Sequence, residues 1–142
     1  MWADTLLAAE RMHLLRLLSW GSGSLLAGTA LLAWLGMRHH RSALLRHFAL
    51  QLAGWGAVDL ALALHGRGSL ALRDIAGATR LDRLLWLNVG LDAGYVMVGA
   101  TLIVTGWRVG RRLELIGAGT GVAVQGSALL LLDLMLTAQI SR

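Results

Sequence analysis

Long apolar stretches dominate the chain, and short polar stretches separate them. The apolar stretches cover residues 14–37, 44–64, 84–107 and 114–138. The hydrocarbon core of a bilayer is roughly 30 Å thick and needs about 20 mostly apolar helical residues for one crossing. Each stretch meets this length, and short connections make consecutive helices antiparallel neighbours. The pattern therefore predicts an all-α fold, an integral membrane four-helix bundle.

The first residues of the chain have a different pattern, in which charged and apolar side chains alternate at helical spacing. This pattern predicts an interfacial amphipathic helix over residues 1–13, followed by a single transmembrane domain over residues 14–142. Its acidic residues offset its arginines and the apolar stretch exceeds signal-peptide length, so we expect the segment to be retained. The pattern comprises apolar Trp2, Leu6 and Ala9 and charged Asp4, Glu10 and Arg11.

Composition supports the membrane assignment. The chain is 56% hydrophobic and has no proline and no cysteine, and its mean hydropathy is +0.63, which a soluble domain of this size would not show. The missing cysteines exclude disulfides, thiolate catalysis and cysteine-ligated metals. The formal net charge is +5, but the arginines lie in short loops and suit anionic lipid headgroups better than nucleic acid.

The distribution of arginine bears on topology. We call the face with both termini and the longest connection, residues 66–80, side A, and the face with the two short loops side B. The long connection has room for a short interfacial helix. Side A carries seven arginines and side B six, a nearly even balance. Because side B holds its arginines in shorter loops, the positive-inside rule favours side B as cytoplasmic.

Two polar pairs suggest an internal repeat. Gln51 precedes Asp59 by eight residues, and Gln125 precedes Asp133 by the same distance, 74 residues further along the chain. A duplication would give two helical hairpins in the same orientation, related by a pseudo-two-fold axis along the membrane normal. Chance similarity between helices rich in leucine and alanine is the alternative.

Three carboxylates, Asp59, Asp92 and Asp133, interrupt the predicted spans. Each is about 12–14 Å along its helix from an arginine at side A, so all three fall in that half of the bilayer. A charged side chain at the centre of a bilayer costs roughly 2.5 to 3.5 kcal/mol and needs a partner, water or the bundle interior. We therefore expect these side chains to face inward.

Each carboxylate has polar neighbours at helical spacing, and two interpretations compete. One is a site that binds a proton, a cation or a small polar solute, because crowded like charges favour uptake of a positive charge. The other is hydrogen bonding between helices, worth roughly 0.6 kcal/mol per bond, that only fixes packing. Arg16 offers a pairing partner for Asp133 or Asp92, which favours the second. The candidate site residues are Asp59, Asp92, Asp133, Asn88, Tyr95, Gln51, Gln125 and Trp55.

Glycine pairs favour close helix packing. Gly90 and Gly94 form one small-xxx-small pair, and Gly117 and Gly121 form another. Such faces let helix backbones approach closely, either within one chain or between chains. Four short spans enclose little volume, so we expect a homo-oligomer or a larger membrane complex.

The histidines do not indicate a haem or metal site. His13 and His65 lie at the side A ends of the spans and His39, His40 and His47 at the side B ends, positions typical of interfacial or lipid-facing side chains. His39 and His40 are adjacent and lack the one-face spacing of a helical metal site. Nucleophile and phosphate-loop motifs are absent from the sequence. We therefore expect no cofactor, no metal and no enzymatic activity.

Several motifs resemble those of a family of small uncharacterised bacterial four-span membrane proteins. The resemblance covers residues 48–133 and leaves the first span unmatched. It implies a fold and a motif set, and it carries over no catalytic role, because the family has no assigned activity. The matching residues are Leu87, Asn88, Val89, Gly90, Leu91, Asp92, Ala93, Gly94 and Tyr95, then Gln125, Gly126 and Asp133, and finally Trp55, Gly56 and Asp59.

These observations lead to one preferred function and one alternative. The preferred function is a transporter-like or channel-like multi-pass protein of a bacterial inner membrane, with an intramembrane polar site. The alternative is an accessory or structural subunit of a larger membrane complex, with no activity of its own. Substitution of the aspartates separates the two, because only a binding site makes stability depend on the ligand.

Overall fold

The computed structural model describes residues 2–140, and over that range it contains helices and no strands. The helices are α1 (Trp2–Met37), α2 (Ala43–Gly68), α3 (Ile75–Arg108) and α4 (Leu113–Ile140). By length and composition, all 4 are long and apolar enough to cross a membrane. The prediction of an all-α fold with four long apolar helices is therefore confirmed.

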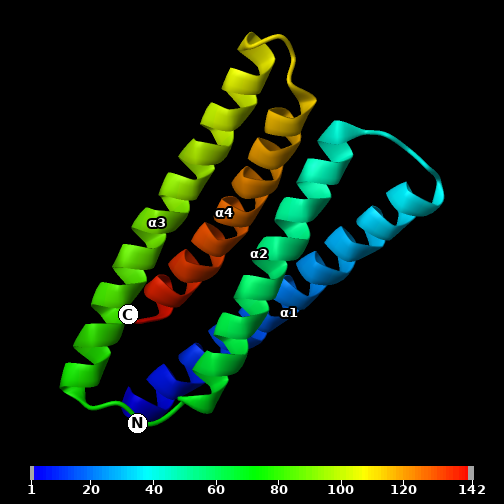
Figure 1. Ribbon diagram of the computed structural model, residues 1–142. Coiled ribbons are helices and arrows are strands. Elements are labelled where there is room, and N and C mark those ends of the chain that lie inside the picture. Colours follow the sequence, from blue (N-terminus) through cyan, green and yellow to red (C-terminus); the bar gives the residue numbers. More distant parts are fainter. Residues whose placement is uncertain (1, 141–142) are drawn as a thin grey trace.

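The helices form two hairpins that pack against each other. α1 packs along α2 and α3 packs along α4, while α4 also contacts α2 and α1 (Figure 1). The connection between α2 and α3 and the start of α1 lie at one end of the bundle, which is side A. The other two connections lie at the opposite end, side B (Figure 1). The helices thus alternate in direction, as their short connections require.

Helix α1 is continuous through the segment that the sequence pattern assigns to the membrane interface. It has 36 residues, and at about 1.5 Å per residue it is longer than the roughly 30 Å hydrocarbon core. The predicted interfacial helix, apart from Met1, which lies outside the described residues, and the predicted first span are therefore parts of one helix. The interfacial position of the first part stays a prediction.

The connection between α2 and α3 is shorter than the sequence pattern suggests. α2 continues to Gly68 and α3 already begins at Ile75, so residues 69–74 form the connection. The Asp74 side chain accepts a hydrogen bond of 2.7 Å from the Gly77 backbone N–H and caps α3. Such a cap satisfies one of the free N–H groups of the first turn. The helix expected within residues 66–80 is the first part of α3.

Glycines bring the two helices of each hairpin close together. A Cβ added to Gly28 in α1 would lie 2.5 Å from the Ala53 backbone nitrogen in α2, and one added to Gly99 in α3 would lie 2.6 Å from the Ala123 nitrogen in α4. Only a hydrogen atom fits at these positions. The two hairpins therefore use matching contacts, and the contacted alanines, residues 53 and 123, are 70 residues apart.

The two predicted glycine pairs have different surroundings. A Cβ at Gly117 would collide with the backbone of Leu44, and one at Gly121 would lie 2.5 Å from the Gln51 side chain, so this pair packs α4 on α2. Nothing within the described residues lies within 4 Å of the Cβ positions of Gly90 and Gly94. The α3 pair therefore leaves an open face of small residues on the outside of the bundle.

Candidate functional site

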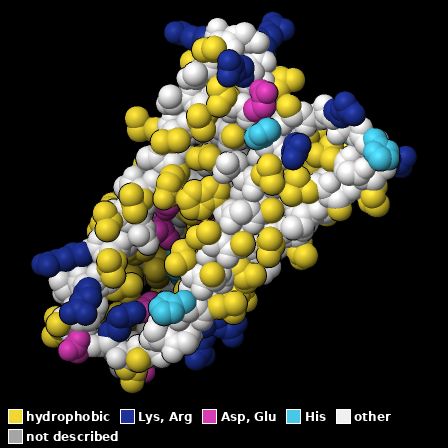
Figure 2. Space-filling model, viewed as in Figure 1, with side chains coloured by type: hydrophobic (Ala, Val, Ile, Leu, Met, Phe, Trp, Pro, Cys, Tyr) yellow, Lys and Arg dark blue, Asp and Glu magenta, His cyan; other side chains and the backbone are white. Residues whose placement is uncertain are grey.

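The three aspartates lie in the interior of the bundle, which agrees with the inward orientation expected from the sequence. Asp59, Asp92 and Asp133 expose 1%, 5% and 7% of their surface. The Asp92 carboxylate acts electrostatically on both Asp59 and Asp133. Figure 2 shows acidic side chains among hydrophobic ones between α2 and α3. The tertiary structure thus brings carboxylates from three helices into one electrostatically coupled group.

Glycines on neighbouring helices allow close approach to the helices that carry Asp59 and Asp92. Gly21 of α1 lies opposite Asp59, where an added Cβ would be 3.0 Å from the Asp59 Cβ. Gly126 of α4 lies opposite Asp92, where an added Cβ would be 3.0 Å from the Asp92 carbonyl oxygen. The Oδ2 atoms of Asp59 and Asp92 are buried and have no hydrogen-bond partner within the described residues. Both oxygens are therefore free to accept a hydrogen bond.

Asp133 is the best-connected of the three aspartates. Its Oδ1 lies 3.4 Å from Nε2 of His13 on α1, and the Asn88 side chain of α3 also reaches its carboxylate. The Thr137 hydroxyl donates a hydrogen bond of 2.8 Å to the Asp133 carbonyl oxygen. Asp133 thus links α4 to α1 and α3.

Two charged residues that the sequence pattern assigned to the surface, Glu10 and Arg73, form an ion pair, and Glu10 lies in the interior. Glu10 exposes only 5% of its surface and accepts two hydrogen bonds from the Arg73 guanidinium, at 2.6 and 2.9 Å. Because Glu10 accepts these bonds, the pKa of Arg73 is raised. The pair fastens the connection between α2 and α3 onto α1 and closes the side A end.

Residue spacing along α1 was the sequence signal that could have placed Glu10 and His13 in the interior. Glu10, His13, Arg16 and Trp20 follow one another at three- and four-residue intervals, which places them on one face of a helix. Sequence reasoning treated residues 1–13 as an interfacial segment with a solvated face, and so it missed Glu10 and His13. The continuous helix α1 instead turns this face towards the bundle.

The two glutamines and the rings of Trp55 and Tyr95 each lie further from side A than the aspartate of the same helix. Gln125 exposes 2% of its surface, and its Oε1 accepts a hydrogen bond from Nε1 of Trp20. Its Nε2 has no partner within residues 2–140. The rings of Trp55 and Tyr95 are 5.0 Å apart and connect α2 with α3. Gln51 is half-buried and packs against the Gly121 backbone.

Two further polar residues, Asn88 and Arg16, are not fully buried. Asn88 is exposed although its side chain reaches Asp133. Arg16 is half-buried, and its Nη1 is buried without a hydrogen-bond partner among the described residues. Within residues 2–140, Arg73 forms an ion pair with Glu10 and His13 lies beside Asp133, so the pairing of Arg16 with Asp133 or Asp92, one of the alternatives from the sequence, does not occur there.

The acidic and histidine side chains do not form a compact metal-binding group. Within the described residues, no three of them are arranged to hold a metal ion. The Asp92 carboxylate interacts electrostatically with those of Asp59 and Asp133, and His13 lies beside Asp133. Chemically, these buried carboxylates offer single acceptors for protons or hydrogen bonds.

The four helices are long and apolar enough to cross a membrane and enclose buried carboxylates, so by length and hydropathy they suggest the class of multi-pass helical membrane proteins. The chain belongs to a family of unknown function, DUF6992, whose model matches residues 16–134. This match includes most of the first span, which the motif resemblance over residues 48–133 left out. No curated protein and no solved structure matches the chain.

Proposed function

We propose that this protein is a multi-pass membrane protein whose interior carboxylates bind a proton, a cation or a small polar solute. Such a site would serve a transporter-like or channel-like oligomer in a bacterial inner membrane. Asp59, Asp92 and Asp133 are the central binding residues in this proposal. Asn88, Tyr95, Gln51, Gln125 and Trp55 complete the candidate set.

The buried Oδ2 atoms of Asp59 and Asp92, which lack a partner among the described residues, carry the proposal. Burying an ionised carboxylate without a partner costs several kcal/mol. Membrane proteins keep such groups where a proton, an ion or a substrate neutralises them. A bound positive charge or hydrogen-bond donor would remove this cost.

Among the possible ligands, a proton fits the arrangement best. Asp133 has a histidine within 3.4 Å and is coupled to Asp92, which is coupled to Asp59. Chains of carboxylates and histidines are the usual proton relays of pumps and transporters. One proton would relieve the repulsion between two neighbouring aspartates, because like charges at short range disfavour joint ionisation.

The test compares Asp59→Asn, Asp92→Asn and Asp133→Asn with the unchanged protein. Thermal stability in detergent is measured across pH and with added sodium or potassium salts. Because asparagine keeps the shape and removes the titrating group, each variant is expected to weaken the dependence on pH or on the cation.

Asp82→Asn is the matched control for this experiment. Asp82 also lies on α3, but it is half-buried and lies outside the coupled group. It should therefore retain the response of the unchanged protein. If all three interior variants also retain that response, the carboxylates do not bind a ligand and the proposal fails.

The alternative function is an accessory subunit of a larger membrane complex. It is favoured by the open face at Gly90 and Gly94, where no described residue lies within 4 Å of the added Cβ positions. Small-residue faces pack against other helices in membranes. Under this alternative, a partner protein co-purifies in fixed stoichiometry from native membranes, and Gly90→Leu abolishes the association.

The predicted internal repeat is supported by glycine contacts that match between the two hairpins. The residues that make these contacts are 70 positions apart, whereas the Gln and Asp pairs predict 74. The Cβ position of Gly56 in α2 lies against Gly21, Ser24 and Leu25, and that of Gly126 in α4 lies against Asp92, Tyr95 and Val96. Residues 56 and 126 are 70 positions apart, whereas Gln51 and Gln125 are 74 apart. We infer that a pseudo-two-fold axis would relate the hairpins at the shorter spacing, so the two Gln and Asp pairs would differ by about one helical turn.

A further inference from the structure

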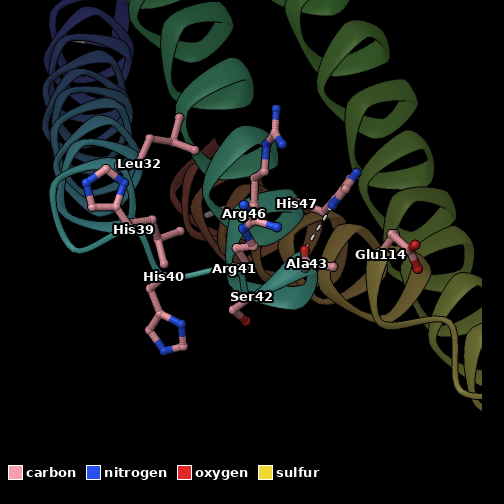
Figure 3. A pocket seen from close by; sticks show the side chains of 11 residues that line it. Leu32, His39, His40, Arg41, Ser42, Ala43, Arg46, His47 and Glu114 are labelled. Carbon is pink, nitrogen blue, oxygen red and sulfur yellow. Dashed lines mark hydrogen bonds between the residues drawn. The ribbon is translucent and has the colours of Figure 1, made fainter.

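A second polar region lies at side B, at the opposite end of the bundle from the Glu10 and Arg73 pair. A cavity of about 650 Å³ opens there between the end of α1, the start of α2 and the start of α4. Figure 3 shows its side chains around the first turn of α2, with Leu32 on α1 and Glu114 on α4. Its polar lining consists of His39, His40, Arg41, Ser42, Arg46, His47 and Glu114.

The charges in this cavity favour an anion. Arg41 and Arg46 outnumber the single acid, Glu114, and the ion pairs within residues 2–140 involve neither arginine. Nδ1 of His47 lies 2.9 Å from the Ala43 carbonyl oxygen. A carbonyl only accepts, so Nδ1 carries the hydrogen and this bond orients the imidazole. Two unpaired guanidinium groups are therefore available to a negatively charged ligand.

The backbone adds to this positive potential. Helix α2 begins at Ala43, beside the cavity, and its N-cap Ser42 uses its side chain for the Leu45 N–H. The remaining N–H groups of a first turn and the positive end of the helix dipole attract phosphate and carboxylate groups. The start of α2 thus reinforces the two arginines.

The rest of the lining is apolar, and its position matches a membrane interface. Leu32 and Leu35 of α1 form a nonpolar wall next to the polar end of the cavity. Next to this wall, the Trp34 ring lies 5.9 Å from the ring of His40, and tryptophan is enriched at the level of lipid headgroups. A ligand that fills the cavity therefore needs an anionic group and an attached hydrocarbon chain.

We propose that this cavity binds the phosphate group of an anionic phospholipid, held by Arg41 and Arg46, with an acyl chain along Leu32 and Leu35. A soluble phosphate would use the arginines alone and would leave the apolar wall without a partner. Arginine recognises phosphate oxygens through paired, charge-assisted hydrogen bonds. The site is separate from the interior aspartates and does not depend on their function.

The test measures lipid binding to the full-length protein in detergent by native mass spectrometry and by lipid-dependent thermal shift. The probes are dioleoylphosphatidylglycerol, dioleoylphosphatidylcholine and inorganic phosphate. The unchanged protein is expected to bind phosphatidylglycerol more tightly than phosphatidylcholine. The double variant Arg41→Gln with Arg46→Gln is expected to lose about tenfold or more in affinity for phosphatidylglycerol, because two charge-assisted contacts are removed.

The matched control is Arg108→Gln with Arg112→Gln, which removes the same charge from the other helix connection at side B, at the end of α3 and just before α4. It should keep the affinity for phosphatidylglycerol within about twofold, because these arginines do not line the cavity and exposed charges act weakly. Melting temperatures without added lipid verify that both double variants fold. The single variants Arg41→Gln and Arg46→Gln repeat the affinity measurement with the loss of one positive charge instead of two.

Three results would overturn the proposal. The first is a cavity variant that binds phosphatidylglycerol as tightly as the unchanged protein. The second is an equal loss of affinity in the control, which would mean that only the overall charge of side B matters. The third is an equal stabilisation by inorganic phosphate at the same concentration, which would identify a soluble anion as the ligand.

Discussion

At the scale of single residues, the interior combines carboxylates with partners and carboxylates without them. Glu10 has a guanidinium on both oxygens and Asp133 has a histidine at 3.4 Å. Asp59 and Asp92 each keep an oxygen without a partner in the described part of the chain. Glu10 is therefore suited to holding the bundle together and Asp59 and Asp92 to binding, while Asp133 both contacts α1 and belongs to the proposed binding group.

The ion pair of Glu10 with Arg73 is expected to stabilise the fold. Arg73→Ala leaves a buried carboxylate without a partner, which should lower the free energy of unfolding by about 1–3 kcal/mol. This range is below that of a fully buried pair because the Arg73 side chain is 32% exposed and water screens part of its interaction. Thermal unfolding in detergent measures the effect.

The double variant Glu10→Ala with Arg73→Ala tests whether the pair itself is responsible. In a Glu10→Ala background, Arg73→Ala should cost much less than it does alone, because no buried charge is left behind. Arg67→Ala, at the exposed end of α2, should change stability by less than about 0.5 kcal/mol. Equal losses for Arg73→Ala in both backgrounds would show that the two side chains do not act together.

At the scale of helices, glycine decides which faces meet. Gly28 and Gly99 sit where an added Cβ would lie 2.5 and 2.6 Å from the backbone of the partner helix, whereas Gly23 and Gly90 have nothing within 4 Å among the described residues. The same residue type therefore plays two roles. At the first pair it permits packing, and at the second it leaves the helix surface open.

Alanine substitutions should separate these roles. Gly28→Ala and Gly99→Ala are expected to lower the free energy of unfolding by about 1–3 kcal/mol, because the added methyl group forces the helices apart. Gly23→Ala and Gly90→Ala should be neutral, or stabilising by up to about 1 kcal/mol, through better helix propensity. Unfolding of each variant in detergent gives the comparison, and similar losses at all positions would disprove the assigned contacts.

At the scale of the whole molecule, the bundle has two chemically different ends. Side A is closed by the Glu10 and Arg73 pair, and the interior aspartates lie among the helices. Side B carries the cavity with its unpaired arginines. The dark blue arginine side chains gather towards the two ends in Figure 2, while hydrophobic side chains cover much of the length between them.

The predicted topology places side B in the cytoplasm. Because the sequence has no cysteine, single cysteines can report accessibility to a membrane-impermeant maleimide. Ser69→Cys should react in intact cells, whereas His40→Cys and Val109→Cys should react only after the membrane is permeabilised. The opposite pattern would reverse the orientation. Labelling of all three from the same side would contradict a four-span arrangement.

The sequence was sufficient for the four long apolar helices and for the burial of the three aspartates. Both follow from local physics, because each apolar stretch must be long enough for a bilayer and a charged side chain avoids hydrocarbon. The sequence was less reliable at the ends of helices. Composition suggests separate interfacial helices over residues 1–13 and within residues 66–80, but helix continuity and the Asp74 cap make residues 2–13 part of α1 and residues 75–80 part of α3.

Residues from separate helices had to be brought together by the tertiary structure. His13 opposite Asp133, Arg73 on Glu10 and Trp20 on Gln125 are contacts between distant parts of the chain. Composition and periodicity say which side chains share one helix face, and they do not say which faces meet. The positions of glycines relative to the opposing backbones decide that, because close contact depends on the fit between surfaces from different parts of the sequence.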